Sequence, residues 1–305
     1  MLIPSALQNF LDVVNTQPPV YVPQQNRDLF EQLSAHFALP KVNVAWISNY
    51  SVPLATHELA VRNYHPQPQK KLPVIFYFHG GGHMCGSLDS YDALCRRLAL
   101  TSHCVLVSVA YRLAPEFPYP AGLTDCLAVI QQRATLLKEI EVKSDCVFLA
   151  GDSAGGNLAL SVAYALKKQG DNALKGLVLI YPSVDYSMQH NSFQRNGEGF
   201  LLTKAKVKWY FDHYFAQGGD RIGASPLYFP QLNLLPPMYL AVAEYDPLFD
   251  EGVLLAKKMR DLGGAVVLEE FAGMVHVFAQ LETLVPAEIV RLHQSIKNFI
   301  SRFVE

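Results

Sequence analysis

From about residue 41 to the end of the chain, short runs of apolar residues alternate with longer segments in which apolar positions recur every three or four residues. Short continuous runs are typical of strands buried on both faces, and a period near 3.6 is typical of helices with one buried face. The strands predicted in this way span residues 42–48, 58–64, 74–78, 105–110, 146–150, 177–181, 238–243 and 265–271. The predicted helices span residues 91–101, 123–137, 155–168, 251–262 and 287–303. This alternation predicts an α/β fold, a mostly parallel eight-stranded sheet flanked by helices, with the first two strands as an edge hairpin.

Two segments lie outside this alternation: the amphipathic stretch of residues 1–40, and an insertion at residues 185–218 that is rich in Phe, Tyr and Trp. The aromatic residues of the insertion recur at helical spacing, which an ordinary packed helix would also show. We interpret both segments as a helical cap, because insertions at the carboxyl ends of parallel strands are where such folds bind ligands. The predicted organisation is N-terminal cap helices in 1–40, a cap insertion in 185–218, and an α/β domain in 41–184 and 219–305.

The composition of the chain limits the kinds of partner that it is expected to bind. Half of the 305 residues are apolar and 17% are charged, a balance typical of a globular domain. With a formal net charge of -2 and no block of Lys or Arg, the chain is not expected to bind nucleic acid or an anionic membrane surface. Its longest apolar runs, residues 72–78 and 104–111, are far shorter than the roughly 20 residues that span a bilayer. The first residues lack the positive charge of a secretory signal, so we expect a cytoplasmic protein.

The five cysteines are odd in number and show no C-x-x-C spacing, so neither a disulfide framework nor a zinc site is expected. Cys104, Cys126 and Cys146 lie in apolar runs and are expected to act as small apolar side chains. Cys85 lies beside a glycine-rich loop and is the candidate for a reactive thiol, although we do not assign it a catalytic role. The sequence shows no motif for binding a metal, a nucleotide or a dinucleotide, so no metal site and no cofactor are expected.

The run Gly151-Asp152-Ser153-Ala154-Gly155 is a G-x-S-x-G motif. The letters alone arise by chance in roughly one of ten chains of this length, so the argument depends on their place between a predicted strand and a predicted helix. The glycines permit a sharp, strained turn that exposes a serine hydroxyl, and the following helix N-terminus favours a negatively charged oxygen. Ser153 is therefore a candidate nucleophile, whereas Asp152 points elsewhere on such a turn.

The run His79-Gly80-Gly81-Gly82 follows the strand predicted at 74–78. Three consecutive glycines at a strand end remove side chains, so that backbone N–H groups can approach a substrate oxygen. A flexible glycine turn is the alternative. The occurrence of both motifs in the order that one fold requires favours an oxyanion hole.

A nucleophilic serine needs a base, and in this type of site the chain order is serine, acid, histidine. Of the ten histidines, only His276 and His293 follow every plausible acid. His293 belongs to the amphipathic helix predicted at 287–303 and is expected to be structural. His276 follows the last predicted strand, from which an imidazole can reach the carboxyl edge of the sheet, and is the candidate base.

For the acid, Asp246 follows the strand predicted at 238–243 and precedes Pro247, which suits the first turn of a helix. Asp250 and Glu251 are expected in the first turn of that helix, where they complement its dipole, and Glu244 precedes the turn. Asp246 is therefore the candidate acid.

With these residues placed, the chain resembles the hormone-sensitive-lipase-like family of bacterial esterases, which have the α/β-hydrolase fold. The resemblance covers roughly residues 70–280 and includes the two glycine motifs, residues 111–116 (Y-R-L-A-P-E), residues 246–248 (D-P-L) and residues 250–252 (D-E-G). It implies a carboxylic ester hydrolase for short- to medium-chain acyl esters, acting through Ser153, Asp246 and His276. It also implies that the oxyanion donors are the N–H groups of Gly81, Gly82 and Ala154, and that His79 is structural. No cofactor is implied, and the expected partner is a small-molecule ester, with the chain a monomer or homodimer.

Two residues depart from the family pattern. His83 stands where a bulky aromatic residue is usual, and Val277 replaces a common glycine after the histidine of the triad. Both are expected to change the shape of the pocket and not the triad. Two alternatives stay open: the same triad acting on amides or lactones, and a non-catalytic ligand-binding protein of this fold, which the presence of His276 with its acid disfavours.

Overall fold

The computed structural model describes residues 2–138, 140 and 142–304. In this part of the chain, eight strands form one sheet in the order β1-β2-β4-β3-β5-β6-β7-β8. β2 runs antiparallel to both β1 and β4, and the other neighbours are parallel. The strands are β1 (Trp46–Pro53), β2 (Glu58–His65), β3 (Leu72–Phe78), β4 (Val105–Val109), β5 (Val142–Asp152), β6 (Leu174–Ile180), β7 (Met238–Tyr245) and β8 (Val266–Val275). The predicted α/β fold with a mostly parallel eight-stranded sheet is confirmed.

The central strands are largely apolar because helices cover both faces of the sheet. All residues of β3 and β4 are buried. The edge strand β1 is largely exposed and contains Ser48, Asn49 and Ser51, so it lacks that apolar signature. The prediction of a strand at 42–48 was therefore wrong in its bounds. A tight hairpin fixes β1 instead by pairing Pro53 with Glu58.

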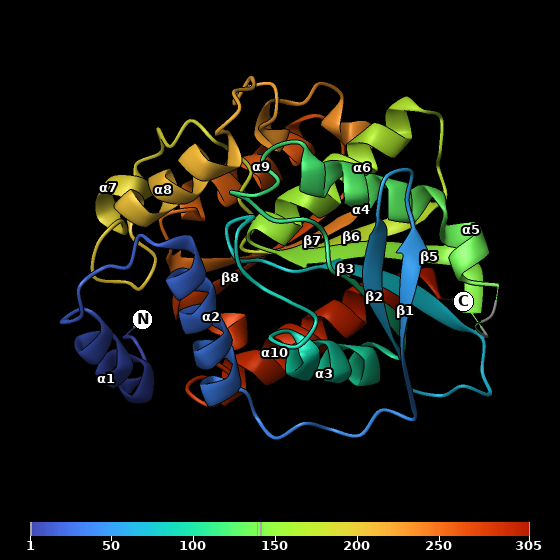
Figure 1. Ribbon diagram of the computed structural model, residues 1–305, viewed down its shortest axis with the longest axis horizontal. Helices are drawn as coiled ribbons and strands as arrows, with labels where there is room; N and C mark the ends of the chain where they lie inside the picture. Colours follow the sequence, from blue (N-terminus) through green and yellow to red (C-terminus); the bar gives the residue numbers. More distant parts are fainter. Residues whose placement is uncertain (1, 139, 141, 305) are drawn as a thin grey trace.

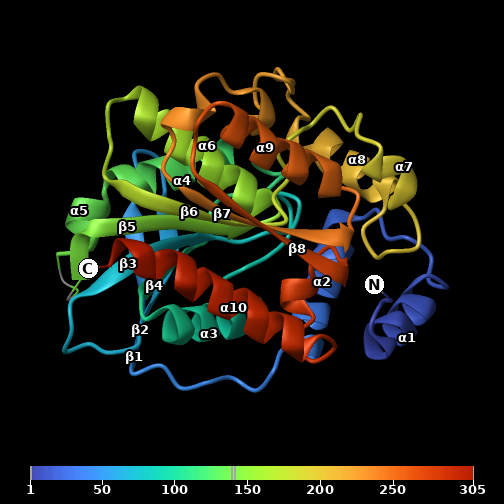
Figure 2. The same ribbon diagram turned by 180° about the vertical axis from the view of Figure 1, so that it is seen from behind.

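Helices flank the sheet on both sides (Figure 1, Figure 2). One face is covered by α3 (Asp92–Ser102) and α10 (Pro286–Ile300), and the other by α4 (Ala121–Gln131), α6 (Ala154–Lys168) and α9 (Phe249–Asp261). The helix predicted at 123–137 is divided in two, because the backbone leaves the helical conformation at Gln132 before the short α5 (Arg133–Leu136). Short 3₁₀ segments are η1 (Pro226–Tyr228), η2 (Leu232–Leu234), η3 (Phe278–Gln280) and η4 (Ser301–Phe303).

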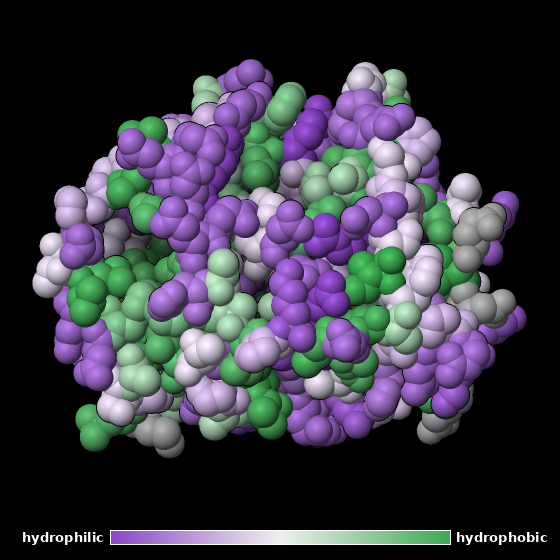
Figure 3. Space-filling model, turned by 60° about the horizontal axis from the view of Figure 1, so that its bottom comes forward, coloured by the Kyte–Doolittle hydropathy of each residue, from purple (hydrophilic) through white to green (hydrophobic). Residues whose placement is uncertain are grey.

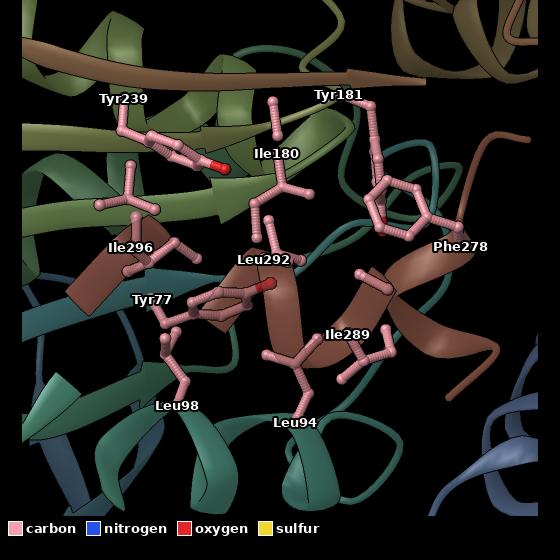
Figure 4. Close-up of a cluster of buried hydrophobic side chains, with 14 of the residues drawn as sticks. Tyr77, Leu94, Leu98, Ile180, Tyr181, Tyr239, Phe278, Ile289, Leu292 and Ile296 are labelled. Atoms are coloured by element: carbon pink, nitrogen blue, oxygen red, sulfur yellow. The ribbon is translucent and has the colours of Figure 1, made fainter. Parts of the chain in front are cut away.

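The core under α3 and α10 shows how the two helices are fixed to the sheet. In Figure 4 the ring of Tyr77 of β3 lies between Leu94 and Leu98 of α3 on one side and Leu292 and Ile296 of α10 on the other, and all five belong to one buried cluster. Each such apolar side chain contributes about 1.5–3 kcal/mol on burial. This packing holds the sheet rigid beneath its carboxyl edge, where the loops that follow β3, β5, β7 and β8 meet.

Four helices lie beyond that edge: α1 (Ser5–Val14), α2 (Pro23–Phe37), α7 (Ser192–Arg195) and α8 (Lys204–Tyr214). Figures 1 and 2 agree that the N-terminal pair and the pair from the insertion lie at the same end of the sheet, far from the C-terminus. These four helices, together with the segments that join them within residues 2–40 and 185–218, are called the cap below. Apolar side chains gather at the left of the face in Figure 3, the side of α1 and α2, and Leu2, Val13 and Leu29 are among the exposed ones.

None of the helices described is both long and apolar enough to cross a membrane.

Candidate active site

Ser153 lies in the sharp turn between β5 and α6, with backbone angles φ 51° and ψ -120°. A residue other than glycine is strained at positive φ and keeps this conformation only where its surroundings hold it. The Ser153 N–H donates to the carbonyl of Ile180 at 2.9 Å, which fixes the turn to the neighbouring strand. At Gly155 a Cβ would lie 1.9 Å from the Phe78 carbonyl oxygen, so the turn tolerates no side chain there.

Three side chains from three loops meet at this turn. The Nε2 atom of His276 lies 2.8 Å from Ser153 Oγ, and its Nδ1 atom lies 2.6 Å from Asp246 Oδ2. An ionised carboxylate can only accept, so Nδ1 carries the proton and Nε2 of the neutral ring accepts from the serine hydroxyl. The other oxygen of Asp246 accepts from the Leu248 N–H at 2.7 Å, which fixes the carboxylate. The structure therefore brings the three predicted residues into one hydrogen-bonded chain.

The glycine loop after β3 lies opposite Ser153, and Gly81, Gly82, Ser153 and Ala154 line one cavity. The Gly81 carbonyl accepts from the N–H groups of two following residues, which fixes the loop. Among the described residues, the N–H groups of Gly81 and Gly82 donate to no protein acceptor. At Gly82, where φ is +63°, a Cβ would lie 2.5 Å from the Tyr210 ring, so glycine is needed both for the conformation and for the close approach of α8.

The remaining motif residues hold the glycine loop and the turn at Ser153 through hydrogen bonds and ring stacking. Asp152 is fully buried and accepts from two tyrosine hydroxyls, including that of Tyr91 at 2.8 Å, and from the Gly80 N–H at 2.9 Å. Burial raises the pKa of Asp152. His79 stacks on Tyr111 with ring centroids 4.4 Å apart, and burial lowers its pKa to about 4. Its Nδ1 atom lies 2.8 Å from the Gly80 carbonyl oxygen. Asp152 and His79 are thus both bound to the loop at Gly80, and neither of them faces the Ser153 hydroxyl.

The cavity above Ser153 has a volume of about 200 Å³ and a mainly apolar lining. The cap supplies most of its wall through Leu29, Phe30 and Leu33 of α2, Leu201 and Leu202 of the insertion, and Lys206, Val207, Tyr210 and Phe211 of α8. Tyr214 of α8, which does not line the cavity, packs together with Phe211 and Val207 into a hydrophobic cluster rich in aromatic residues. The insertion thus forms a packed helix and the wall of a cavity at the same time.

A family model described as the alpha/beta hydrolase fold matches residues 75–280. The chain belongs to this family. Ethyl acetate hydrolase of Pseudomonas putida is 34% identical over 266 residues, which cover 85% of this chain and 84% of that protein. The arylesterase of Saccharolobus solfataricus is 31% identical over 260 residues, with 84% of each chain covered. Among solved structures, an ester hydrolase from the metagenome of Lake Arreo gives a TM-score of 0.94 at 28% identity, with both chains covered fully. These matches confirm the family that the sequence motifs indicated.

Two residues of this α/β hydrolase that depart from the family pattern both line the cavity. The ring of His83 stacks flat on Tyr214, with centroids 3.7 Å apart and 5° between the planes, and its Nε2 atom lies 3.0 Å from the Tyr186 hydroxyl oxygen. Burial lowers the pKa of His83 to about 3. Val277 has φ 66°, which is strained for a β-branched residue.

Other acids and histidines of the α/β hydrolase lie away from the serine. Asp250 and Glu251 begin α9 as predicted. Asp250 accepts from the N–H of Ser192, whereas Glu251 is buried and accepts from the Val184 N–H at 2.6 Å. Burial raises the pKa of Glu251 well above its usual range. His293 is buried on α10, as expected for a structural residue.

The glycine loop is also held from outside the motifs by α2. Arg27 Nε donates to the Met84 carbonyl at 2.9 Å, and its Nη2 atom donates to the Ala114 carbonyl at 2.9 Å. The Asn26 amide donates to Cys85 Sγ at 2.9 Å and to the Tyr210 hydroxyl at 2.7 Å. No local motif signals these contacts, which join segments more than 50 positions apart.

The thiol of Cys85 is fully buried, and burial raises its pKa. A reactive cysteine is accessible and has a lowered pKa. Cys85 thus lacks both properties of a reactive thiol. Cys104, Cys126 and Cys146 are also buried, as expected for small apolar side chains.

Proposed function

We propose that this chain is a carboxylic ester hydrolase in which Ser153 is the nucleophile, His276 the general base and Asp246 the acid that orients it. The observation that carries the proposal is the continuous hydrogen-bonded chain from Asp246 through His276 to Ser153, ending in an apolar cavity. The named esterases among the relatives support the same chemistry. Ser153 and His276 are only 8% and 4% exposed, so a substrate reaches them through the cavity.

The reaction follows from this geometry. As Ser153 Oγ attacks the ester carbonyl, His276 Nε2 takes its proton, and the imidazolium that forms is stabilised by Asp246. The carbonyl oxygen becomes an oxyanion, which the N–H groups of Gly81, Gly82 and Ala154 stabilise by about 3 kcal/mol each. His276 then gives its proton to the leaving alcohol and later takes one from the water that releases the acid.

The remaining motif residues have a structural role in this proposal. Asp152 and His79 hold the two loops through Gly80, and Gly151 and Gly155 permit the turn at Ser153. The cap, made of residues 1–40 and 185–218, closes the site against the α/β domain of residues 41–184 and 219–305. Because the cap walls a cavity of about 200 Å³, the preferred acyl chains are short to medium, with about eight carbons or fewer.

A panel of soluble p-nitrophenyl esters from acetate to palmitate, with matched anilides and a lactone, tests this function. We expect kcat/KM to be highest at or below eight acyl carbons and to be unaffected by a metal chelator. Faster hydrolysis of palmitate than of butyrate, or of the anilides than of the esters, would contradict the proposed substrate class.

A further inference from the structure

Among the described residues that line the cavity there is one lysine and no Asp, Glu or Arg. This residue, Lys206, lies in the first turns of α8 and is half-buried. Among the described residues, no carboxylate forms an ion pair with it. A neighbouring lysine of the same helix, Lys208, is exposed and pairs with Asp212 at 2.6 Å. The two lysines differ therefore in both exposure and partner.

The ammonium group of Lys206 is surrounded by aromatic rings and one carbonyl group. It lies 4.3 Å from the ring centroid of Trp209, 5.2 Å from that of Tyr21 and 5.4 Å from that of Tyr210. It also donates to the carbonyl oxygen of Val20, in the segment between α1 and α2. These partners are neutral, and an ammonium group has three N–H donors. The positive charge is thus without a compensating negative charge in this wall.

Burial also makes the charge of Lys206 costly, since it lowers the pKa to about 8. An unbranched apolar side chain such as methionine could pack against the same rings without that cost. A ligand with a negative charge would remove the cost of burying the Lys206 charge, because it would supply the missing counter-charge. A single cation suits a singly charged carboxylate better than a phosphate, which carries up to two charges.

We propose that Lys206 binds a carboxylate carried by the ester substrate, on its acyl or its alcohol part. The substrate class is then that of monoesters of dicarboxylic acids, or of esters whose alcohol bears a carboxylate. The inference rests on the proposed ester hydrolase function and adds the charge of the substrate to it.

Two matched pairs of esters test the inference. The acyl arm compares p-nitrophenyl hexanoate with the p-nitrophenyl monoester of adipate, and the alcohol arm compares phenyl butyrate with 4-carboxyphenyl butyrate. In Lys206→Met we expect the ratio of kcat/KM for the charged ester to kcat/KM for its neutral partner to fall about tenfold or more in one arm. Lys206→Arg should keep most of the charged-ester activity, and Lys208→Met serves as the control with no change in either ratio.

A charged-to-neutral ratio that is the same in wild type and Lys206→Met, in both arms, overturns the inference. If wild type hydrolyses none of the four esters, it is the proposed function that fails. A second measurement needs no variant and remains available if Lys206→Met does not fold. The half-amide of adipate should inhibit wild type at least tenfold more tightly than hexanamide, or 4-hydroxybenzoate more tightly than phenol, and equal inhibition in both pairs overturns the inference.

Discussion

At the scale of single residues, the proposed mechanism depends on a serine kept in a strained backbone conformation. Such strain costs about 1–3 kcal/mol and persists where neighbours over-determine it. Here the hydrogen bond from Ser153 to Ile180 and the close contact of Gly155 with the carbonyl group of Phe78 in β3 hold the strained conformation. The strain directs the Ser153 hydroxyl at His276 and leaves the N–H of Ala154 next to it.

The assignment of Asp246 as the acid can be tested by comparison with Asp250, which lies four positions further along the chain. Asp246→Asn should lower kcat by about 10³- to 10⁴-fold, because an amide does not hold the required tautomer of His276. Asp250→Asn is the matched control and should change kcat by less than about tenfold, since Asp250 contacts Ser192 and Arg195 of the cap and not the histidine. Steady-state kinetics on p-nitrophenyl butyrate decide between them. The reverse ranking would mean that the acid is misassigned.

The pH dependence separates His83 from His276. The pKa of His83 lies at about 3, below its ordinary value of 6.5, so this side chain stays neutral from about pH 4 upward and cannot contribute a limb at higher pH. Only protonation of His276 removes the base. His83→Phe should therefore keep the acid limb of kcat/KM within about half a pH unit, while altering acyl preference through the shape of the cavity. Tyr186→Phe, which removes the hydrogen bond to His83 and keeps the aromatic ring, is the control. A limb that moves by more than about one unit in His83→Phe would show proton transfer by this residue.

At the scale of elements, the cap both walls the cavity and holds the oxyanion loop. Helix α2 contacts that loop through Arg27 and Asn26, and α8 places Tyr210 directly over Gly82. Docking of the cap is thereby linked to the position of the N–H groups at Gly81 and Gly82. A displacement of about 1 Å at such a group can lower a rate 10²-fold.

Arg27→Met tests this link. The variant loses the hydrogen bonds to the Met84 and Ala114 carbonyl groups and the ion pair with Glu116, so we expect kcat to fall about tenfold with KM nearly unchanged. Arg133→Met is the control, because it removes a comparably buried ion pair, with Asp171, on the short helix α5 outside the site. Equal kinetics in the two variants would mean that α2 contributes only stability.

These contacts could not be predicted from the sequence, because Arg27 and Asn26 form no local motif and their partners are far along the chain. The insertion was predicted as cap from its place after the sixth strand. Its aromatic residues left two interpretations open, and in the structure α8 belongs to a packed hydrophobic cluster and also lines the cavity. The edge strand β1 was misplaced because pairing in a hairpin, and not apolar pattern, fixes its bounds.

At the scale of the whole molecule, the buried strands were predictable because strands covered on both faces must be continuously apolar. Parallel strands end at one edge, so Ser153, Asp246 and His276, each directly after a strand, could be expected to meet there although more than 100 residues separate the first from the last. The distances within the triad, and the charge of Lys206 in the cavity, depend on packing between cap and sheet and needed the structure. The fold and the candidate site thus follow from pattern, whereas the chemistry of the substrate pocket does not.

The most direct test of the account is the identity of the residue that a phosphonate ester with a p-nitrophenol leaving group modifies covalently. Reaction with such a compound, followed by intact mass and peptide mapping, should give one adduct per chain, on Ser153, with ester hydrolysis lost in proportion to labelling. Ser153→Ala should take up no label and should lose about 10⁵-fold or more in kcat. An adduct on a different residue, or hydrolysis that persists after complete labelling, would contradict the assignment of Ser153 as the nucleophile.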